Sequence, residues 1–168
     1  MCRFLILLLI ILSCSCYKRD CSFIAKNEKT TYNIHLDSTI KLADMNQIIL
    51  AFNFWKEVSG GIIDYQIVYD RNYIFPKHND IFFTKEVSTE NQLLAVYYKQ
   101  SKLIKIMISH IDGDALFKNT IIHELGHYFG LSHSEDYYSY MFYAIDNKTS
   151  YLNKKDKEEF CKSVCCKK

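Results

Sequence analysis

The stretch "HELGHYFGLSH" at residues 123–133 places three histidines and one glutamate within eleven residues. His123 and His127 are four residues apart, so on a helix they stand on one face, with Cβ atoms about 5–6 Å apart. Two imidazoles at that separation can bind one tetrahedral zinc ion. Glu124 is placed to accept a proton from a water that zinc activates for attack on a carbonyl. The pattern therefore indicates a hydrolytic zinc site.

A third zinc ligand requires the chain to turn back after the helix. A helix that continued past His127 would carry His133 away from the metal, but Gly130 lacks Cβ and can adopt the left-handed conformation of a sharp turn. Three histidines leave the fourth zinc position open, as in catalytic sites. The alternative is a helix with solvated surface histidines. Half of the six histidines of the chain lie within these eleven residues, which favours the zinc site.

The residues before the motif predict the elements that position it. Alternation of β-branched or aromatic residues with polar ones predicts five strands, at residues 30–37, 62–70, 80–86, 93–100 and 103–111. Helical spacing of apolar residues predicts a long helix that ends at Gly60 and Gly61; its apolar residues are Met45, Ile48, Ile49, Phe52, Trp55 and Val58. This order is typical of an α+β domain with a mixed sheet and helices packed on it.

A second helix is predicted to carry the motif. Asp112 or Asp114 is a suitable N-cap, and Gly130 lies where the helix should end. Its apolar face is supplied by Leu116, Phe117, Thr120, Ile121, Leu125, Tyr128 and Phe129.

The extended motif HExxHxxGxxH resembles the signature of the metzincin zinc peptidases, in which a methionine turn follows. Here "SYMFY" at residues 139–143 places Met141 eight residues after His133. That short gap, Ser134 directly after the third histidine, and "HIDGD" at residues 110–114 are similar to the matrixin branch. The resemblance covers residues 30–145. It implies a metzincin-like zincin fold: a twisted mixed sheet, a long helix, an active-site helix and a C-terminal methionine turn.

Carried over residue by residue, the resemblance makes His123, His127 and His133 the ligands of one catalytic zinc ion. Glu124 becomes the general base, and Met141 becomes the apolar floor of the site.

Other parts of the matrixin pattern differ in this chain. Tyr143 stands where matrixins usually have proline, and in this it resembles astacins and serralysins, whose tyrosine binds zinc or stabilises the oxyanion; packing is the alternative role. A second, structural zinc site is not recognisable. Asp112 and Asp114 have side chains suited to calcium, although helix capping explains them as well.

The N-terminal residues predict export. Arg3 precedes an unbroken apolar run from Phe4 to Leu12, which is too short to span a bilayer and fits a signal peptide over residues 1–15. "ILSC" at residues 11–14 resembles a lipobox, so we expect a lipid on Cys14 or Cys16, with ordinary secretion as the alternative. Residues 22–168 would then form a single catalytic domain with a cysteine-containing tail.

The seven cysteines favour the same oxidising compartment. Cys21 lies near one end, and three cysteines lie in the tail "CKSVCCKK" at residues 161–168. One or two disulfides can join the two ends, but the pairing cannot be derived from the sequence. The chain lacks CxxC pairs, so a cysteine metal cluster is not favoured.

The sequence therefore predicts an exported zinc endopeptidase that acts as a monomer on a polypeptide substrate. The net charge of +2 does not favour nucleic acid, and contact with a membrane is expected only through the lipid anchor. The substrate would pair with the edge strand within residues 93–100, and residues 142–146 would select its side chain. The alternatives are a non-catalytic zinc-containing surface domain for binding or adhesion, and a zinc hydrolase with a substrate other than a peptide.

Overall fold

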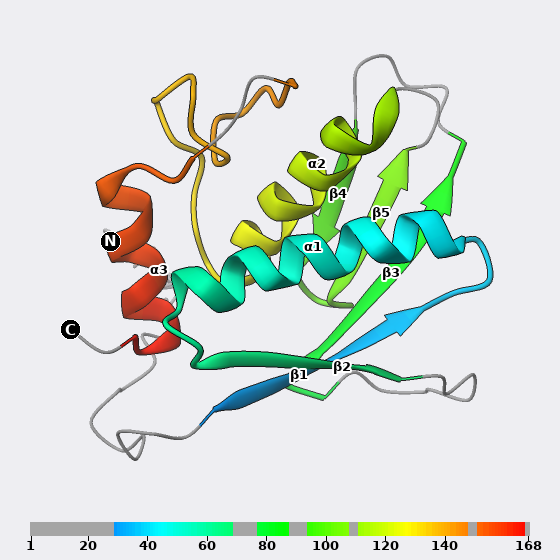
Figure 1. Ribbon diagram of the computed structural model, residues 1–168, viewed down its shortest axis with the longest axis horizontal. Coiled ribbons are helices and arrows are strands. Elements are labelled where there is room, and N and C mark those ends of the chain that lie inside the picture. Colours follow the sequence, from blue (N-terminus) through cyan, green and yellow to red (C-terminus); the bar gives the residue numbers. More distant parts are fainter. Residues whose placement is uncertain (1–28, 69–76, 88–93, 108–110, 148–150, 167–168) are drawn as a thin grey trace, which may run out of the picture.

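The computed structural model describes residues 29–68, 77–87, 94–107, 111–147 and 151–166 (Figure 1). Its elements, in chain order, are β1 (Thr30–Leu36), α1 (Leu42–Val58), β2 (Ile63–Val68), β3 (Asp80–Glu86), β4 (Ala95–Tyr98), β5 (Leu103–Met107), α2 (Gly113–Tyr128) and α3 (Lys154–Val164). The predicted α+β class is confirmed, and each observed strand lies within a predicted one. The predicted signal peptide, Cys21 and His110 lie outside the described residues.

The five strands form one mixed sheet in the order β2-β1-β3-β5-β4. All neighbouring pairs are parallel except β4 and β5, which are antiparallel. The strand β4 therefore forms one edge of the sheet. Met107 donates its N–H to the carbonyl of Leu94 at 2.8 Å. Backbone groups alternate in direction along a strand, so those of Ala95 and Tyr97 point to the free edge.

Helices α1 and α2 lie on the same face of the sheet (Figure 1). The core between these two layers consists mainly of fully buried side chains: Ile34, Ile81, Phe83, Ile104 and Ile106 from the sheet, Ile48, Phe52 and Trp55 from α1, and Ile121 and Leu125 from α2. The indole N–H of Trp55 donates to the carbonyl of Ile122 at 3.1 Å, which joins α1 directly to the motif helix.

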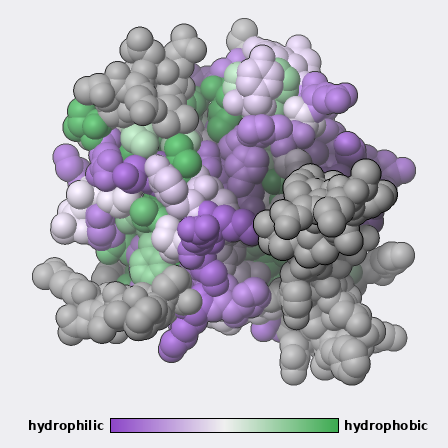
Figure 2. Space-filling view, turned by 180° about the vertical axis from the view of Figure 1, so that it is seen from behind, coloured by the Kyte–Doolittle hydropathy of each residue, from purple (hydrophilic) through white to green (hydrophobic). Residues whose placement is uncertain are grey.

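The opposite face of the sheet carries polar side chains that pair across the strands. Gln66 donates to Asn33 at 2.7 Å, and Asn33 donates to Asp80 at 2.8 Å. Lys105 and Glu86 form an ion pair at 3.0 Å. Figure 2, which shows the molecule from behind, has hydrophilic residues across the middle of this view. The polar outer side chains explain why the two packed helices share the other face.

The C-terminal helix α3 was not predicted from the sequence, which indicated only a cysteine-containing tail. It begins after Asn153, whose side chain accepts the N–H of Asp156 at 2.9 Å. Phe160 is fully buried, with its ring centroid 4.6 Å from that of Trp55. The apolar residues Leu152, Phe160 and Val164 are the signal that could have revealed this helix.

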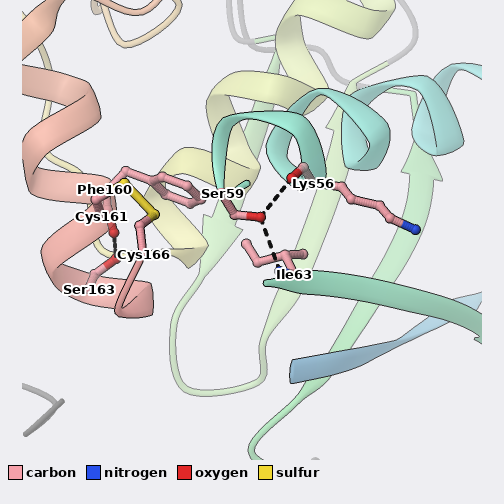
Figure 3. Close-up of a disulfide and its surroundings, with 7 residues drawn as sticks. All are labelled: Lys56, Ser59, Ile63, Phe160, Cys161, Ser163 and Cys166. Atoms are coloured by element: carbon pink, nitrogen blue, oxygen red, sulfur yellow. Dashed lines mark hydrogen bonds between the residues drawn. A yellow bond between two sulfur atoms is a disulfide. The ribbon is translucent and has the colours of Figure 1, made fainter. Parts of the chain in front are cut away.

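The end of α3 is closed by a disulfide between Cys161 and Cys166 (Figure 3). These two cysteines pair within the tail and so do not join the ends of the chain. Cys165 is disulfide-bonded as well. In the same view, Ser59 donates its hydroxyl to the carbonyl of Lys56 and accepts the N–H of Ile63, which fixes the turn from α1 into β2.

Among the described residues, every helix is too short or too polar to cross a membrane.

Candidate metal centre and active site

The motif lies in α2, whose second half is almost completely enclosed. His123 and Glu124 are only 4% and 6% exposed. Of the two predicted N-cap residues, Asp112 is the one observed, although its side chain makes no capping hydrogen bond. The helix is buried on more sides than an amphipathic pattern suggests, because it packs against both α1 and β4. This enclosure lets α2 hold its polar residues in fixed positions.

The helix ends at the predicted glycine. Gly130 has φ +94°, a conformation that side chains with Cβ rarely adopt. Its N–H bonds to the carbonyl of His127 at 3.0 Å, and the N–H of Leu131 bonds to the carbonyl of Gly126 at 2.9 Å. These two bonds form a Schellman turn. The turn brings His133 back towards the helix.

The three histidines converge on one point. The Nε2 atom of His127 lies 3.0 Å from that of His123 and 3.2 Å from that of His133. One ligand atom from each histidine lies within 4.8 Å of the others, and this is the one three-residue cluster of this kind among the described residues.

Backbone carbonyls orient two of the imidazole rings. The Nδ1–H of His123 donates to the carbonyl of Tyr140 at 2.7 Å, and the Nδ1–H of His127 donates to that of Leu131 at 2.9 Å. In this tautomer each Nε2 presents a lone pair to the shared point. Lone pairs so close repel each other unless a cation lies between them. Tetrahedral zinc with N–Zn bonds of about 2.0–2.1 Å needs nitrogens roughly 3.4 Å apart, so the cluster fits zinc.

The protonation states of the histidines suit metal binding. Burial lowers the pKa of His123 to about 3, and the neighbouring His127 adds to the effect. Burial also lowers the pKa of His127. Both rings are therefore neutral at pH 7, and the neutral imidazole is the form that binds a metal.

Glu124 faces the edge strand. Burial raises the pKa of its carboxyl to about 7, and a hydrogen bond from the backbone N–H of Tyr97 opposes that rise. A carboxyl group with a pKa near neutrality can both accept and return a proton under physiological conditions. Tyr97 was not predicted as a site residue. Its contribution is a backbone N–H, which the type of side chain does not reveal.

Met141 is fully buried directly against α2. A Cβ atom on Gly126 would lie 2.3 Å from the sulfur of Met141, so the side chain of Met141 fills the space that the glycine leaves open. The carbonyl of Met141 accepts the N–H of Ser134 at 2.7 Å. This packing agrees with an apolar support beneath the histidines. Its assignment as a methionine turn stays a prediction.

A buried polar chain fixes the segment around Met141. The hydroxyl of Ser139 donates to the carboxylate of Asp156 at 2.5 Å and accepts the N–H of Met141 at 3.0 Å. Ser139 is fully buried and Asp156 is 4% exposed. Tyr140, whose carbonyl orients His123, lies between Ser139 and Met141. Helix α3 thus supports the metal centre through a contact that the sequence did not predict.

Two further residues complete the description of the site. Asn119, one turn before His123, donates its side-chain amide to the carbonyl of Asp146 at 3.2 Å, which holds the loop after Met141 beside α2. Tyr143 is 71% exposed, and its ring packs against Phe142 at a centroid distance of 4.4 Å. A role of Tyr143 in catalysis stays a prediction, as does calcium at Asp112 and Asp114.

Comparison with known proteins agrees with this site and fold. Residues 88–162 match the model of the Peptidase_M10 family, described as matrixin. The crystal structure of archaemetzincin from Methanopyrus kandleri has a TM-score of 0.61 at 13% identity, covering 84% of this chain and 99% of that chain. The structure of myroilysin has a TM-score of 0.57 at 13% identity, covering 84% of this chain and 96% of that one. No curated protein matches the chain.

The fold is similar to that of archaemetzincin and myroilysin, and the three-histidine cluster fits the zinc site of the metzincins. The segment that carries the three histidines matches the matrixin family model, which covers less than half of the chain. The resemblance predicted from the motif is therefore confirmed.

Proposed function

We propose that the chain is a zinc-dependent endopeptidase, in which His123, His127 and His133 hold the metal and Glu124 is the general base. The observation that carries this proposal is the convergence of three Nε2 atoms next to a buried carboxyl group that faces the edge strand. A purely structural zinc site has no need of a base beside it.

The proposed roles follow from the positions of the side chains. Zinc, when bound, supplies a Lewis acid that polarises a carbonyl and lowers the pKa of water. Glu124 accepts the proton of the attacking water and passes it to the leaving amine. The carbonyls of Tyr140 and Leu131 keep His123 and His127 in the tautomer that binds metal, and Met141 excludes water from below.

The proposed substrate is an extended polypeptide that lies along β4. The outward N–H and C=O groups of Ala95 and the outward C=O of Tyr97 can add a strand by backbone hydrogen bonds. In the substrate-free state the N–H of Tyr97 bonds to Glu124. Pairing along β4 therefore places the scissile bond next to the base.

Export is also part of the proposal, on the basis of the apolar run from Phe4 to Leu12. The mature domain would comprise residues 22–168 and act as a monomer, anchored by a lipid on Cys14 or Cys16 or freely secreted. Metabolic labelling with a fatty-acid analogue tests the anchor. A protein without label at either cysteine would contradict it.

The first test of the function compares cleavage of an unstructured protein by the wild type and by Glu124→Ala, each with its zinc content measured. We expect the variant to bind one zinc ion and to lose a factor of about 10²–10⁴ in turnover, the contribution typical of a general base. A chelator should abolish wild-type cleavage. Inactivity of both proteins at full zinc occupancy would contradict the proposal and support a zinc-containing binding domain.

A further inference from the structure

The loop after the third histidine carries an unusual concentration of exposed aromatic side chains. Tyr137, Tyr138, Tyr143 and Tyr151 are 47%, 54%, 71% and 42% exposed. Four other large apolar side chains are comparably exposed among the described residues, and they are spread over α1, β4 and the end of β3: Leu42, Leu50, Val87 and Tyr98. Together with Phe142, the four loop tyrosines are called here the tyrosine surface.

Three of its ring contacts run in an unbroken series. The ring centroid of Tyr137 lies 5.2 Å from that of Tyr138 and 5.3 Å from that of Phe142, and Phe142 lies 4.4 Å from Tyr143. Rings that support one another lose little conformational freedom when a ligand binds. The surface is therefore a preorganised platform.

The tyrosine surface is continuous with the proposed active site. Ser134, which follows His133, donates its N–H to the carbonyl of Met141 and forms a bridge with Phe142. At the other end of the loop, the carbonyl of Asp146 is held by Asn119 of α2. Figure 1 shows this loop rising beside α2. Tyr137 follows His133 by four residues, so the surface adjoins the third histidine along the chain.

The same loop carries more negative than positive charge. Residues 134–151 include three acids, Glu135, Asp136 and Asp146, and one lysine, Lys148, although the whole chain has a net charge of +2. The carboxylate of Asp136 accepts the N–H of Tyr138 at 3.1 Å and the hydroxyl of Tyr151 at 2.5 Å. Both donors are neutral, so they fix the position of the carboxylate and leave its charge in place.

We propose that the tyrosine surface, with Glu135 and Asp136, selects substrates that carry a lysine or arginine within three residues of the scissile bond. This inference rests on the proposed peptidase function. A cation gains energy from the faces of the tyrosine rings and from the fixed carboxylate at once, and a guanidinium group can also stack on the rings. An apolar side chain would have to desolvate phenols and carboxylates, and an acidic one would be repelled.

The test uses a set of quenched fluorescent peptides of one sequence, in which Arg, Leu or Glu is placed in turn at each of three positions on either side of the cleaved bond. With the wild type at low salt, we expect kcat/KM to be about tenfold higher for Arg than for Leu at one or more positions, and lowest for Glu. The preference should decrease in high salt, because exposed charges are screened.

Variants of the loop test which of its residues cause the preference for arginine. Glu135→Gln/Asp136→Asn keeps the hydrogen-bond acceptors and removes both charges, and Tyr138→Ala removes one exposed ring. Each should reduce the Arg-to-Leu ratio of kcat/KM several-fold. Glu57→Gln, which removes the charge of an exposed acid in the last turn of α1, is the control and should leave the ratio unchanged.

A binding measurement separates this inference from the proposed function. The Glu124→Ala protein with zinc is titrated with the uncleaved Arg, Leu and Glu peptides. Tighter binding of the Arg peptide, weakened by Glu135→Gln/Asp136→Asn, would support the tyrosine surface even if the wild type cleaved none of them. Cleavage without preference for Arg, or equal binding of all three peptides, would overturn the inference and leave the peptidase proposal intact.

Discussion

Gly126 shows how closely the metal centre depends on the size of single residues. It stands on α2 between Glu124 and His127, and the thioether of Met141 occupies the position that a side chain would need. Alanine at this position would gain at most about 1 kcal/mol in helix propensity, whereas overpacking a core costs about 1–3 kcal/mol. The clash should therefore dominate.

We predict that Gly126→Ala lowers the free energy of unfolding by about 1 kcal/mol or more and weakens zinc binding, because Met141 must move. Chemical denaturation and competition with a chelator measure the two effects. In the double variant Gly126→Ala/Met141→Ala the loss should be smaller than the sum of the single losses, since the clashing atoms are gone. A Gly126→Ala protein as stable as the wild type would contradict the tight packing.

At the scale of elements, the metal centre depends on three segments that are distant in the chain. Helix α2 supplies His123, His127 and Glu124, and the edge strand β4 orients the carboxyl group through the N–H of Tyr97. Helix α3 holds the segment below the histidines through Asp156 and Ser139. The site is thus set by contacts between elements and by the motif together.

We predict that Asp156→Ala destabilises the protein by about 2 kcal/mol, because it removes a buried hydrogen bond to a charged group and leaves the Ser139 hydroxyl without that partner. Zinc affinity should fall with it, since Tyr140 next to Ser139 orients His123. Asp156→Asn keeps an oxygen acceptor, so it should lose less stability and less zinc affinity than Asp156→Ala. The control is Glu158→Ala on the exposed side of α3, where an ion pair at 4.0 Å with Lys154 contributes little. Equal effects of Asp156→Ala and Glu158→Ala would contradict the role of α3.

At the scale of the whole molecule, the main core does not include the metal. The side chains between the sheet and the two helices are apolar and fully buried, and Trp55 connects α1 with both α2 and α3. The histidines instead join α2 to the loop that follows it. Loss of the metal should therefore weaken the contact between α2 and this loop, while the rest of the domain stays folded.

We predict that a chelator leaves the far-ultraviolet circular dichroism unchanged and lowers the midpoint of thermal unfolding. Zinc at about 100 times its dissociation constant stabilises the native state by about 2.7 kcal/mol through mass action. Added zinc should restore the midpoint. His133→Ala, which removes the exposed ligand with little loss of packing, should show a much smaller response to zinc; an unchanged response would contradict the three-histidine site.

The sequence by itself determined the elements whose signals are local. The four-residue spacing of His123 and His127 places their side chains on one face only if the segment is a helix. Gly130 permits a turn with positive φ at the end of that helix. The strands and α1 follow from side-chain periodicity, which is a property of each segment alone. For this reason the α+β class, the three histidines and their relation to the metzincins could all be predicted before the structure was known.

Only the tertiary structure decided which distant groups support the site. The N–H of Tyr97, the carbonyl of Tyr140 and the Asp156–Ser139 contact involve backbone atoms or pairs far apart in the chain, and such pairing leaves no trace in residue spacing. The same holds for the hydrogen bond from the hydroxyl of Tyr151 to Asp136. The disulfide between Cys161 and Cys166 is local, but the sequence offers three tail cysteines and does not say which of them pair. These features arise when the chain folds back on itself, because burial and hydrogen bonding then depend on neighbours in space and not in sequence.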